Sequence, residues 1–173
     1  MSLEGLLASA AEAEPREETF TTRGRTITES DIVSFAALTG DWHPQHADAS
    51  WAATGRFGQR VAHGMLLISY AVGLVDFDPE RVVALRGLDG VVFKRPVTIG
   101  DTIHVEGRVD GTRELDDETA LMEMSWKIVN QRSATVARAK VTAVCRREPV
   151  LGQGTGTEAA RLGGGGLFDE VFL

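Results

Sequence analysis

The sequence has a single cysteine and no long hydrophobic run, and its acidic residues outnumber its basic ones. Cys145 by itself cannot form an internal disulfide, and a lone thiol of this kind suits a reducing cytosol. We therefore predict a cytoplasmic protein in which Cys145 is a small buried hydrophobe within a strand.

The shortage of positive charge excludes two classes of partner. The formal net charge is -7 and the pI is about 5.1, whereas nucleic acids and anionic membranes require a basic surface. We expect no nucleic-acid or membrane partner, and any anionic ligand must be held by a few local Lys or Arg side chains. The N-terminal run carries Glu4 and no basic residue, and its apolar stretch is too short to span a bilayer, so we expect neither signal peptide nor anchor.

The length and composition predict one globular domain followed by a tail. A chain of 173 residues with 43% apolar content can bury a sufficient core without a metal or disulfide. We assign residues 1–150 to the domain, which begins with a short helix. Residues 151–173 are rich in glycine and resemble a flexible linker, although the final LFDEVFL is apolar enough to dock on a surface.

The hydrophobic patterns predict helices first and strands afterwards. Residues 19–27 are typical of a strand with a bend at a glycine, and Thr28 is the expected N-cap of a helix that ends at Gly40. Its predicted buried stripe consists of Ile32, Phe35, Ala36 and Leu38. A short helix follows near residues 48–53, and residues 65–75 are apolar all round, which predicts a helix buried on every side.

Four β segments follow, at residues 82–97, 101–109, 119–130 and 134–145. Consecutive antiparallel strands next to one very apolar helix predict an α+β fold, in which a curved antiparallel sheet is wrapped around a central helix. An edge strand of such a sheet is a natural place to pair with a second copy.

The segment TGDWHPQHADAS holds Asp41, His43 and His46 within six positions. Pro44 biases His43 away from helical dihedrals and can open a helical turn that carries His46. Asp41 and His46 could thereby converge on one side of a cleft. A carboxylate beside an imidazole suits general acid–base chemistry near neutral pH.

Two other interpretations of this cluster are open. It could bind a metal with His63 as a further ligand, although the spacings match no established ligand motif. It could also be a structural turn in which Asp41 is a cap and His46 a surface residue. Catalysis is favoured by the later segment VAHGMLLIS, where Gly64 starts an apolar helix. A free amide at a helix start stabilises incoming negative charge, as an oxyanion hole does.

GDWHPQHAD followed by AHGMLL resembles the hydratase motif of the MaoC-like and R-specific enoyl-CoA hydratases, a hot-dog-fold family. The likeness extends to FKRPVTIGDTI and covers about residues 20–146. It implies that Asp41 and His46 are catalytic and hold one water, while the Gly64 amide binds the thioester carbonyl oxygen. The expected reaction is reversible hydration of a trans-2-enoyl thioester to a 3-hydroxyacyl thioester.

The resemblance also implies the partners and cofactors. The substrate is an acyl-CoA or acyl-carrier-protein thioester, with coenzyme A only as part of the substrate and no metal or redox cofactor. The protein is expected to be a homodimer or a dimer of dimers, with each active site near the dimer interface. Chain length, branching, the carrier and the physiological direction stay open.

Some residues around the motif have weaker assignments. The family's Asn is His43 here, which we expect to support the catalytic pair through one ring nitrogen. His63 is expected to support the loop or the helix start. Trp42 could wall an acyl pocket, and Lys94 and Arg95 could attract the phosphates of coenzyme A.

Two rival functions remain at this stage. One is a dehydratase or thioesterase that acts on carrier-protein-bound acyl chains, since one fold hosts many activities. The other is a noncatalytic acyl-thioester-binding subunit.

Overall fold

A computed structural model describes residues 18–148 of the chain. The predicted N-terminal helix and the tail at residues 151–173 lie outside the described residues. The described elements, in chain order, are β1 Glu18–Thr21, β2 Arg25–Thr26, α2 Glu29–Thr39, α3 Pro44–Ala47, α4 Ala49–Thr54, α5 Gly64–Leu74, β3 Val82–Phe93, β4 Thr102–Glu114, β5 Thr119–Asn130 and β6 Thr135–Arg146. In this part of the chain no helix is long and apolar enough to cross a membrane.

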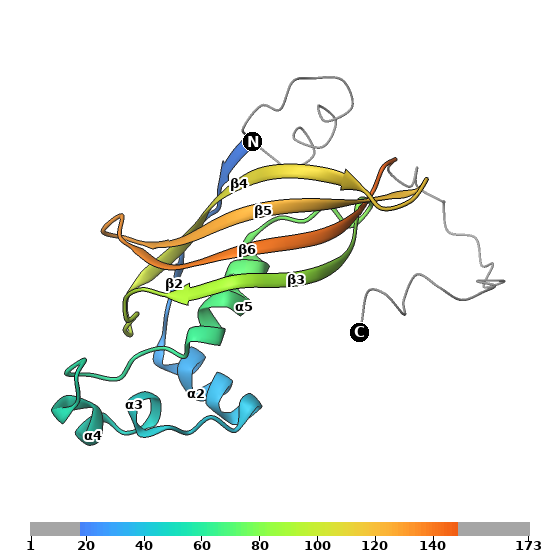
Figure 1. Cartoon of the computed structure of the whole chain (residues 1–173). Coiled ribbons are helices and arrows are strands. Elements are labelled where there is room, and N and C mark those ends of the chain that lie inside the picture. The colour runs from blue at the N-terminus through green and yellow to red at the C-terminus, as the bar shows by residue number, and fades with distance from the viewer. Residues whose placement is uncertain (1–17, 149–173) are drawn as a thin grey trace.

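The strands form one antiparallel sheet in the order β1-β4-β5-β6-β3, with β2 also paired to β4 (Figure 1). The four predicted β segments are therefore confirmed. Although β3 comes first of the four long strands, it pairs with β6 and lies at the far edge of the sheet. One side of β3 consequently has no paired strand among residues 18–148.

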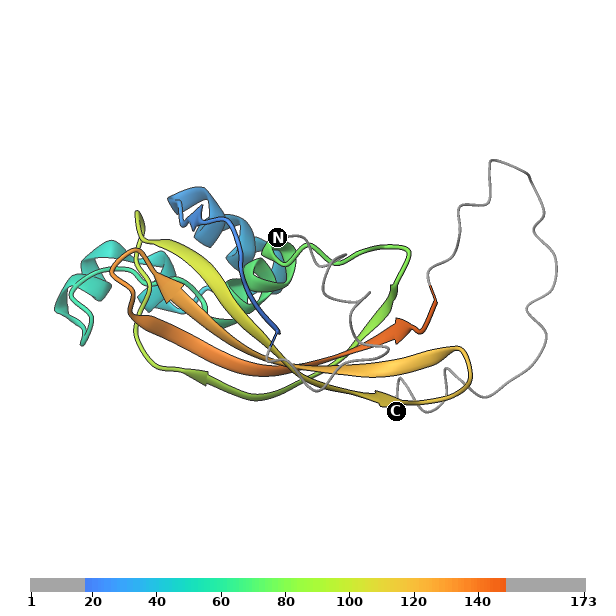
Figure 2. The ribbon, with the colours of Figure 1, turned by 90° about the horizontal axis from the view of Figure 1, so that it is seen from above.

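One face of the curved sheet packs on α5, which lies beneath the long strands in Figure 1, and Figure 2 shows the curvature. Side chains alternate along each strand, so every second residue points to this helix. These inward residues include Ile103 and Val105 of β4, Met122, Met124, Trp126 and Ile128 of β5, and Ala137, Ala139, Val141 and Ala143 of β6, all buried. The predicted α+β fold with a sheet around an apolar helix is confirmed.

Two predictions about burial are wrong. Helix α5 is not buried on every side in the single chain, because Met65 is 53% exposed and Ser69 and Gly73 also face outward. Leu38 does not join the buried stripe of α2 and is 83% exposed. Both errors come from reading apolar character as burial, since a folded chain leaves much apolar surface exposed.

Helix α2 begins and ends where its sequence predicts. Thr28 and Asp31 form a capping box, in which each side chain accepts from the other residue's backbone N–H. At the other end, Gly40 adopts a left-handed φ of 78° and donates its N–H to the Ala36 carbonyl. This termination turns the chain sharply, so that Asp41 lies just beyond the helix.

Asp31 also links three elements that position the loop and α5. Its carboxylate accepts from the Tyr70 hydroxyl of α5 at 2.5 Å and from the Arg25 guanidinium of β2 at 3.1 Å. Although its partial burial opposes ionisation, hydrogen bonds from Tyr70, Thr28 and Arg25 together lower the pKa of Asp31 to about 2. The Tyr70–Asp31 hydrogen bond thus connects α5 to α2.

We expect Asp31→Ala to lower the free energy of unfolding by about 2–3 kcal/mol at pH 7, since it removes a cap and leaves two donors without their acceptor. The pKa is lower in the folded state than its ordinary value of 3.8. The stabilisation is therefore fully present above pH 4 or so and is lost as the pH falls toward 2. Urea denaturation of wild type and variant at pH 7 and pH 3 measures both effects, with exposed Asp76→Ala as the control. An equal loss at both pH values would contradict the assignment.

Cys145 is buried in β6, as predicted. Burial raises the pKa of its thiol to about 11. The thiol is thus protonated at neutral pH and unsuited to nucleophilic chemistry.

Candidate active site

The site begins in the turn between α2 and α3. After Gly40 ends α2, Pro44 occupies the first turn of α3, where its missing N–H costs nothing. Asp41 therefore stays in the loop, with its side chain 52% exposed, while α3 carries His46 inward. The predicted helical turn at Pro44 is confirmed.

His46 is buried, with only 5% exposure, and its ring is held by the backbone of a distant segment. Its Nδ1 lies 2.7 Å from the Val61 carbonyl oxygen, which can only accept, so Nδ1 carries a proton. Burial lowers the pKa of His46; the Val61 bond opposes this change, and the neighbouring His63 reinforces it. Nε2 of the neutral ring then carries no proton, as a base near pH 7 requires.

His63 connects Asp41 to the start of α5. It is the N-cap residue of α5, and its Nε2 donates to the Asp41 carbonyl oxygen at 3.0 Å. Its ring stacks on the ring of His46 with centroids 3.8 Å apart. Its buried Nδ1 has no partner among the described residues. These contacts join the loop at Asp41 to the start of α5, and the supporting role of His63 stays a prediction.

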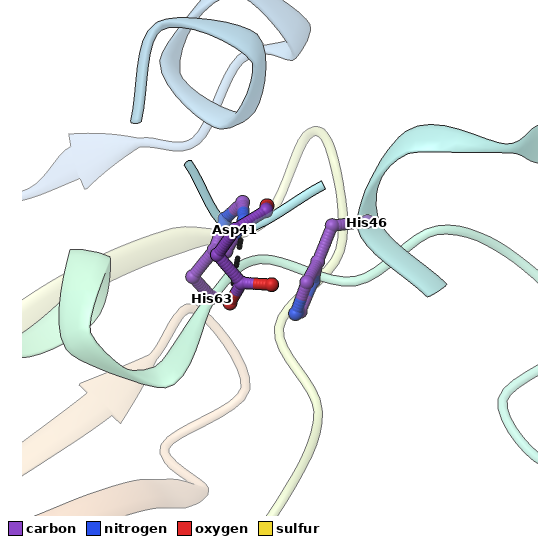
Figure 3. Close-up of side chains that lie close together, drawn as sticks. All are labelled: Asp41, His46 and His63. Atoms are coloured by element: carbon purple, nitrogen blue, oxygen red, sulfur yellow. Dashed lines mark hydrogen bonds and ion pairs between the residues drawn. The ribbon is translucent and has the colours of Figure 1, made fainter. Parts of the chain in front are cut away.

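Asp41, His46 and His63 thus meet from three separate segments (Figure 3). One oxygen or nitrogen atom from each lies within 4.8 Å of the others. A water that makes two hydrogen bonds of ordinary length at a tetrahedral angle spans about 4.6 Å. Asp41 and His46 therefore lie close enough together for one water to contact both side chains.

The same three side chains are less suited to a metal. The rings of His46 and His63 are nearly parallel, with an interplanar angle of 25°. Because imidazole lone pairs lie in the ring plane, two stacked rings direct them side by side rather than toward one ion. The absence of a metal stays a prediction, which metal analysis of the purified protein can test.

Gly64 is the first residue of α5, so its N–H has no acceptor within the helix. No hydrogen bond among the described residues uses this N–H. The ring of Phe93, at the end of β3, lies so close that a Cβ at position 64 would be 2.7 Å from it. A side chain at position 64 would thus need the Phe93 ring or the start of α5 to shift, whereas glycine permits the close contact. The free amide of Gly64 is available to an anion.

His43 replaces the expected asparagine as a cap. Its Nδ1 accepts the N–H of Gln45 at 3.2 Å, which makes His43 the N-cap of α3, and its own N–H points to the Asp41 carboxylate at 3.3 Å. Asparagine is a preferred N-cap for the same reason. The imidazole thus supplies the acceptor that an amide would supply.

The remaining predicted residues lie on the surface of the single chain. Trp42 is 53% exposed, and Lys94 and Arg95 are exposed at the end of β3, directly after Phe93. The Arg95 guanidinium donates to the Thr135 carbonyl at 2.6 Å. A role for these three residues in substrate binding stays a prediction.

The surroundings of the site are open and apolar. Trp42 and Met65 directly follow Asp41 and Gly64 in the chain, and the Phe93 ring lies against Gly64; all three side chains are more than 40% exposed. A hollow of about 740 Å³ lies on the other face of the sheet instead, among side chains such as Lys127 and Arg138 that alternate with the core. The hollow contains none of the predicted site residues.

Sequence reasoning missed three contacts at this site: the Val61 carbonyl on His46, the Gln45 amide on the same ring, and the Phe93 ring on Gly64. Gln45 lies inside the motif and its polar side chain was a usable signal. The contacts of Val61 and Phe93 could not be predicted from the sequence. Every residue has a backbone carbonyl, and the residue type of an apolar side chain does not reveal which group it will contact.

The chain matches the sequence profile described as MaoC like domain over residues 10–131. It is 47% identical to Protein MaoC of Klebsiella aerogenes over 54% of this chain and 28% of that protein. It is 35% identical to the (R)-specific enoyl-CoA hydratase of Aeromonas caviae over 49% of this chain and 63% of that enzyme. The chain thus spans less than two thirds of the length of these relatives.

Solved structures agree with the fold. A monoamine oxidase regulatory protein from Archaeoglobus is 35% identical with a TM-score of 0.73, over 79% of this chain and 93% of that one. The (R)-hydratase of A. caviae involved in PHA biosynthesis is 26% identical with a TM-score of 0.62, over 77% of this chain and 98% of that one. A Mycobacterium tuberculosis protein with a double hot-dog fold has a TM-score of 0.69. It is 22% identical, and the match covers 87% of this chain and 48% of that one. The hot-dog fold is confirmed.

Proposed function

Because the chain belongs to the MaoC like domain family, we propose that it is a hydratase that reversibly adds water to trans-2-enoyl thioesters, with coenzyme A as the favoured carrier. The closeness of the Asp41 and His46 side chains, with one oxygen and one nitrogen atom within 4.8 Å of each other, carries this proposal. The names of its relatives, enoyl-CoA hydratase and 3-hydroxybutyryl-CoA dehydratase among them, support the same class of reaction.

In the proposed mechanism, Asp41 orients a water whose proton passes to Nε2 of His46. The water oxygen bonds to C3 of the enoyl group, and the double-bond electrons shift toward the thioester carbonyl. The Gly64 amide donates to the carbonyl oxygen as negative charge builds there. A proton from the Asp41 and His46 pair then returns to C2, so one water is added in total. Dehydration follows the same steps in reverse.

The direct test mixes purified protein with trans-2-enoyl-CoA esters of several chain lengths and follows loss of the absorbance of the conjugated thioester. Product analysis must find a 3-hydroxyacyl thioester. Free acid as the product would identify a thioesterase, and tight binding without turnover would identify a noncatalytic subunit. The same acyl chain on a carrier protein decides between the two carriers.

We further propose that the working unit is a homodimer joined along β3. The unpaired edge of β3 and the exposed side chains of Val83 and Val92 on this strand support pairing with a second copy. The exposed apolar groups around Gly64, Met65 and Phe93 would be covered by the same association. The partner would then complete the acyl pocket beside Asp41 and His46.

Sedimentation velocity is expected to find a dimer for the wild type. Val92→Lys should convert it to monomer, because each copy would bury a charge at the paired edge. Leu38→Lys introduces the same charge at an exposed position on α2 and should remain dimeric. A Val92→Lys protein that stays dimeric would place the interface elsewhere.

A further inference from the structure

Gln45 contacts the nitrogen of His46 that the proposed reaction needs. Its side chain is half-buried in α3, and its amide nitrogen lies 3.0 Å from Nε2 of His46. No residue was expected at this position from the sequence motif, which leaves the residue before the histidine unspecified.

The direction of this hydrogen bond follows from the other side of the ring. The Val61 carbonyl requires the proton on Nδ1, so Nε2 of the neutral ring is an acceptor with one lone pair in the ring plane. The Gln45 NH₂ group therefore donates to Nε2. Since this lone pair accepts one hydrogen bond, a water cannot donate to it while Gln45 does.

We propose that the Gln45 amide is a placeholder for the reacting water: it holds His46 neutral with its lone pair occupied, and it moves aside when water and substrate enter. The inference rests on the proposed hydratase function. Gln45 is a positioning residue in this scheme, because it acts through His46 and transfers no proton itself.

Only the side chain of Gln45 has to move. Its backbone carbonyl accepts the N–H of Val61 at 3.1 Å, and the His46 ring donates to the Val61 carbonyl. These two bonds tie α3 to the segment before α5 on both sides of the ring. Rotation of a partly exposed side chain is fast, so the exchange of amide for water does not disturb the loop.

Three titratable side chains also lie near His46 and affect its charge, whereas Gln45 itself does not titrate. The ring of His63 is stacked on it, the ring of His43 lies with its centroid 6.3 Å away, and Asp41 lies within the 4.8 Å cluster. Positive charge on either histidine disfavours a charged His46, while Asp41 favours it. The Gln45 donor also disfavours the charged form of His46, because a hydrogen-bond donor on Nε2 stabilises only the neutral ring.

The Gln45–His46 bond can be tested without turnover. We expect nitrogen-15 NMR of the full chain, which has only four histidines, to find neutral His46 with its proton on Nδ1. Gln45→Ala removes the donor and should raise the pKa of His46. Gln45→Glu replaces the donor with an anionic acceptor and should raise it further, by about one to three pH units. Ser50→Ala, an exposed change in α4, is the matched control and should leave the pKa unchanged.

Kinetics then separate a placeholder from a catalytic group. At a pH where His46 is neutral, Gln45→Ala should raise kcat/KM about two- to tenfold. The reason is that the water no longer has to displace the Gln45 amide from Nε2 of His46, and a hydrogen bond of this kind has only a modest net strength. Gln45→Glu should lower kcat/KM at pH 7 by about tenfold or more and recover at higher pH.

An unchanged His46 pKa in Gln45→Glu would overturn the proposal. So would a tenfold loss in Gln45→Ala with His46 neutral. Absence of turnover in the wild type would overturn the hydratase function alone.

Discussion

His46→Gln is expected to lower kcat/KM for hydration of an enoyl-CoA by about 10²- to 10⁴-fold, the usual contribution of a general acid–base group. Glutamine can still donate to the Val61 carbonyl, but it cannot accept and return a proton. Asp41→Asn is expected to have an effect of the same order, because the negative charge is lost. The amide oxygen of Asn can still accept from the His43 N–H, so the local structure should be kept. Steady-state kinetics on folded variants measure both losses.

His104→Gln is the matched control for this pair of variants. It makes the same chemical change on β4, where His104 is partly exposed and lies 3.7 Å from Glu106. Its kcat/KM should equal that of the wild type. Retention of wild-type rates in both His46→Gln and Asp41→Asn would refute the assigned roles.

The same assignment predicts the pH dependence. Hydration needs the neutral ring of His46 as a base, and burial holds the pKa of His46 below the ordinary value of 6.5. The neutral form therefore predominates at pH 7, and kcat/KM should fall only when the pH drops through this lowered pKa. The acidic limb should disappear in His46→Gln and persist in His104→Gln.

Gly64→Ala is expected to lower kcat/KM by up to about 10²- to 10³-fold, the usual effect of losing one oxyanion donor. The N–H itself remains, but the new Cβ would lie 2.7 Å from the ring of Phe93. Either the ring or the start of α5 must shift, and a shift of α5 moves the donor away from the thioester oxygen. Stability measured by urea denaturation should fall as well.

A double variant tests this explanation. Phe93→Leu removes the ring atoms that meet the new Cβ, so Gly64→Ala combined with Phe93→Leu should recover part of the activity lost in Gly64→Ala. Phe93→Leu alone is the reference for any separate effect of the ring. If the double variant is as inactive as Gly64→Ala, the contact with Phe93 does not explain the need for glycine.

The parts of this protein that were predictable from sequence are those set by neighbours along the chain. The capping box of Thr28 and Asp31, the turn at Gly40 and the helical start at Pro44 each depend on residues within four positions. The alternation of the β segments likewise reflects a two-residue period. These local patterns set Asp41 in the loop after α2 and His46 on the short helix α3 that follows it.

Burial of whole elements was less predictable. The apolar residues of α5 and the isolated Leu38 look alike in a sequence, but the sheet covers only one side of the helix. Which apolar residues are buried depends on the elements that pack against them, and those elements come from distant parts of the chain.

By itself the sequence determined the types and order of the elements, the motif that carries Asp41, His46 and Gly64, and the resemblance to one family. Only the tertiary structure decided the proton position on His46, the stacking of His63 and the contact of Phe93 with Gly64. His46 and Val61 are 15 residues apart in the sequence, His63 and His46 are 17 apart, and Phe93 and Gly64 are 29 apart. Contacts of this kind depend on how sheet and helices pack, and no local pattern encodes them.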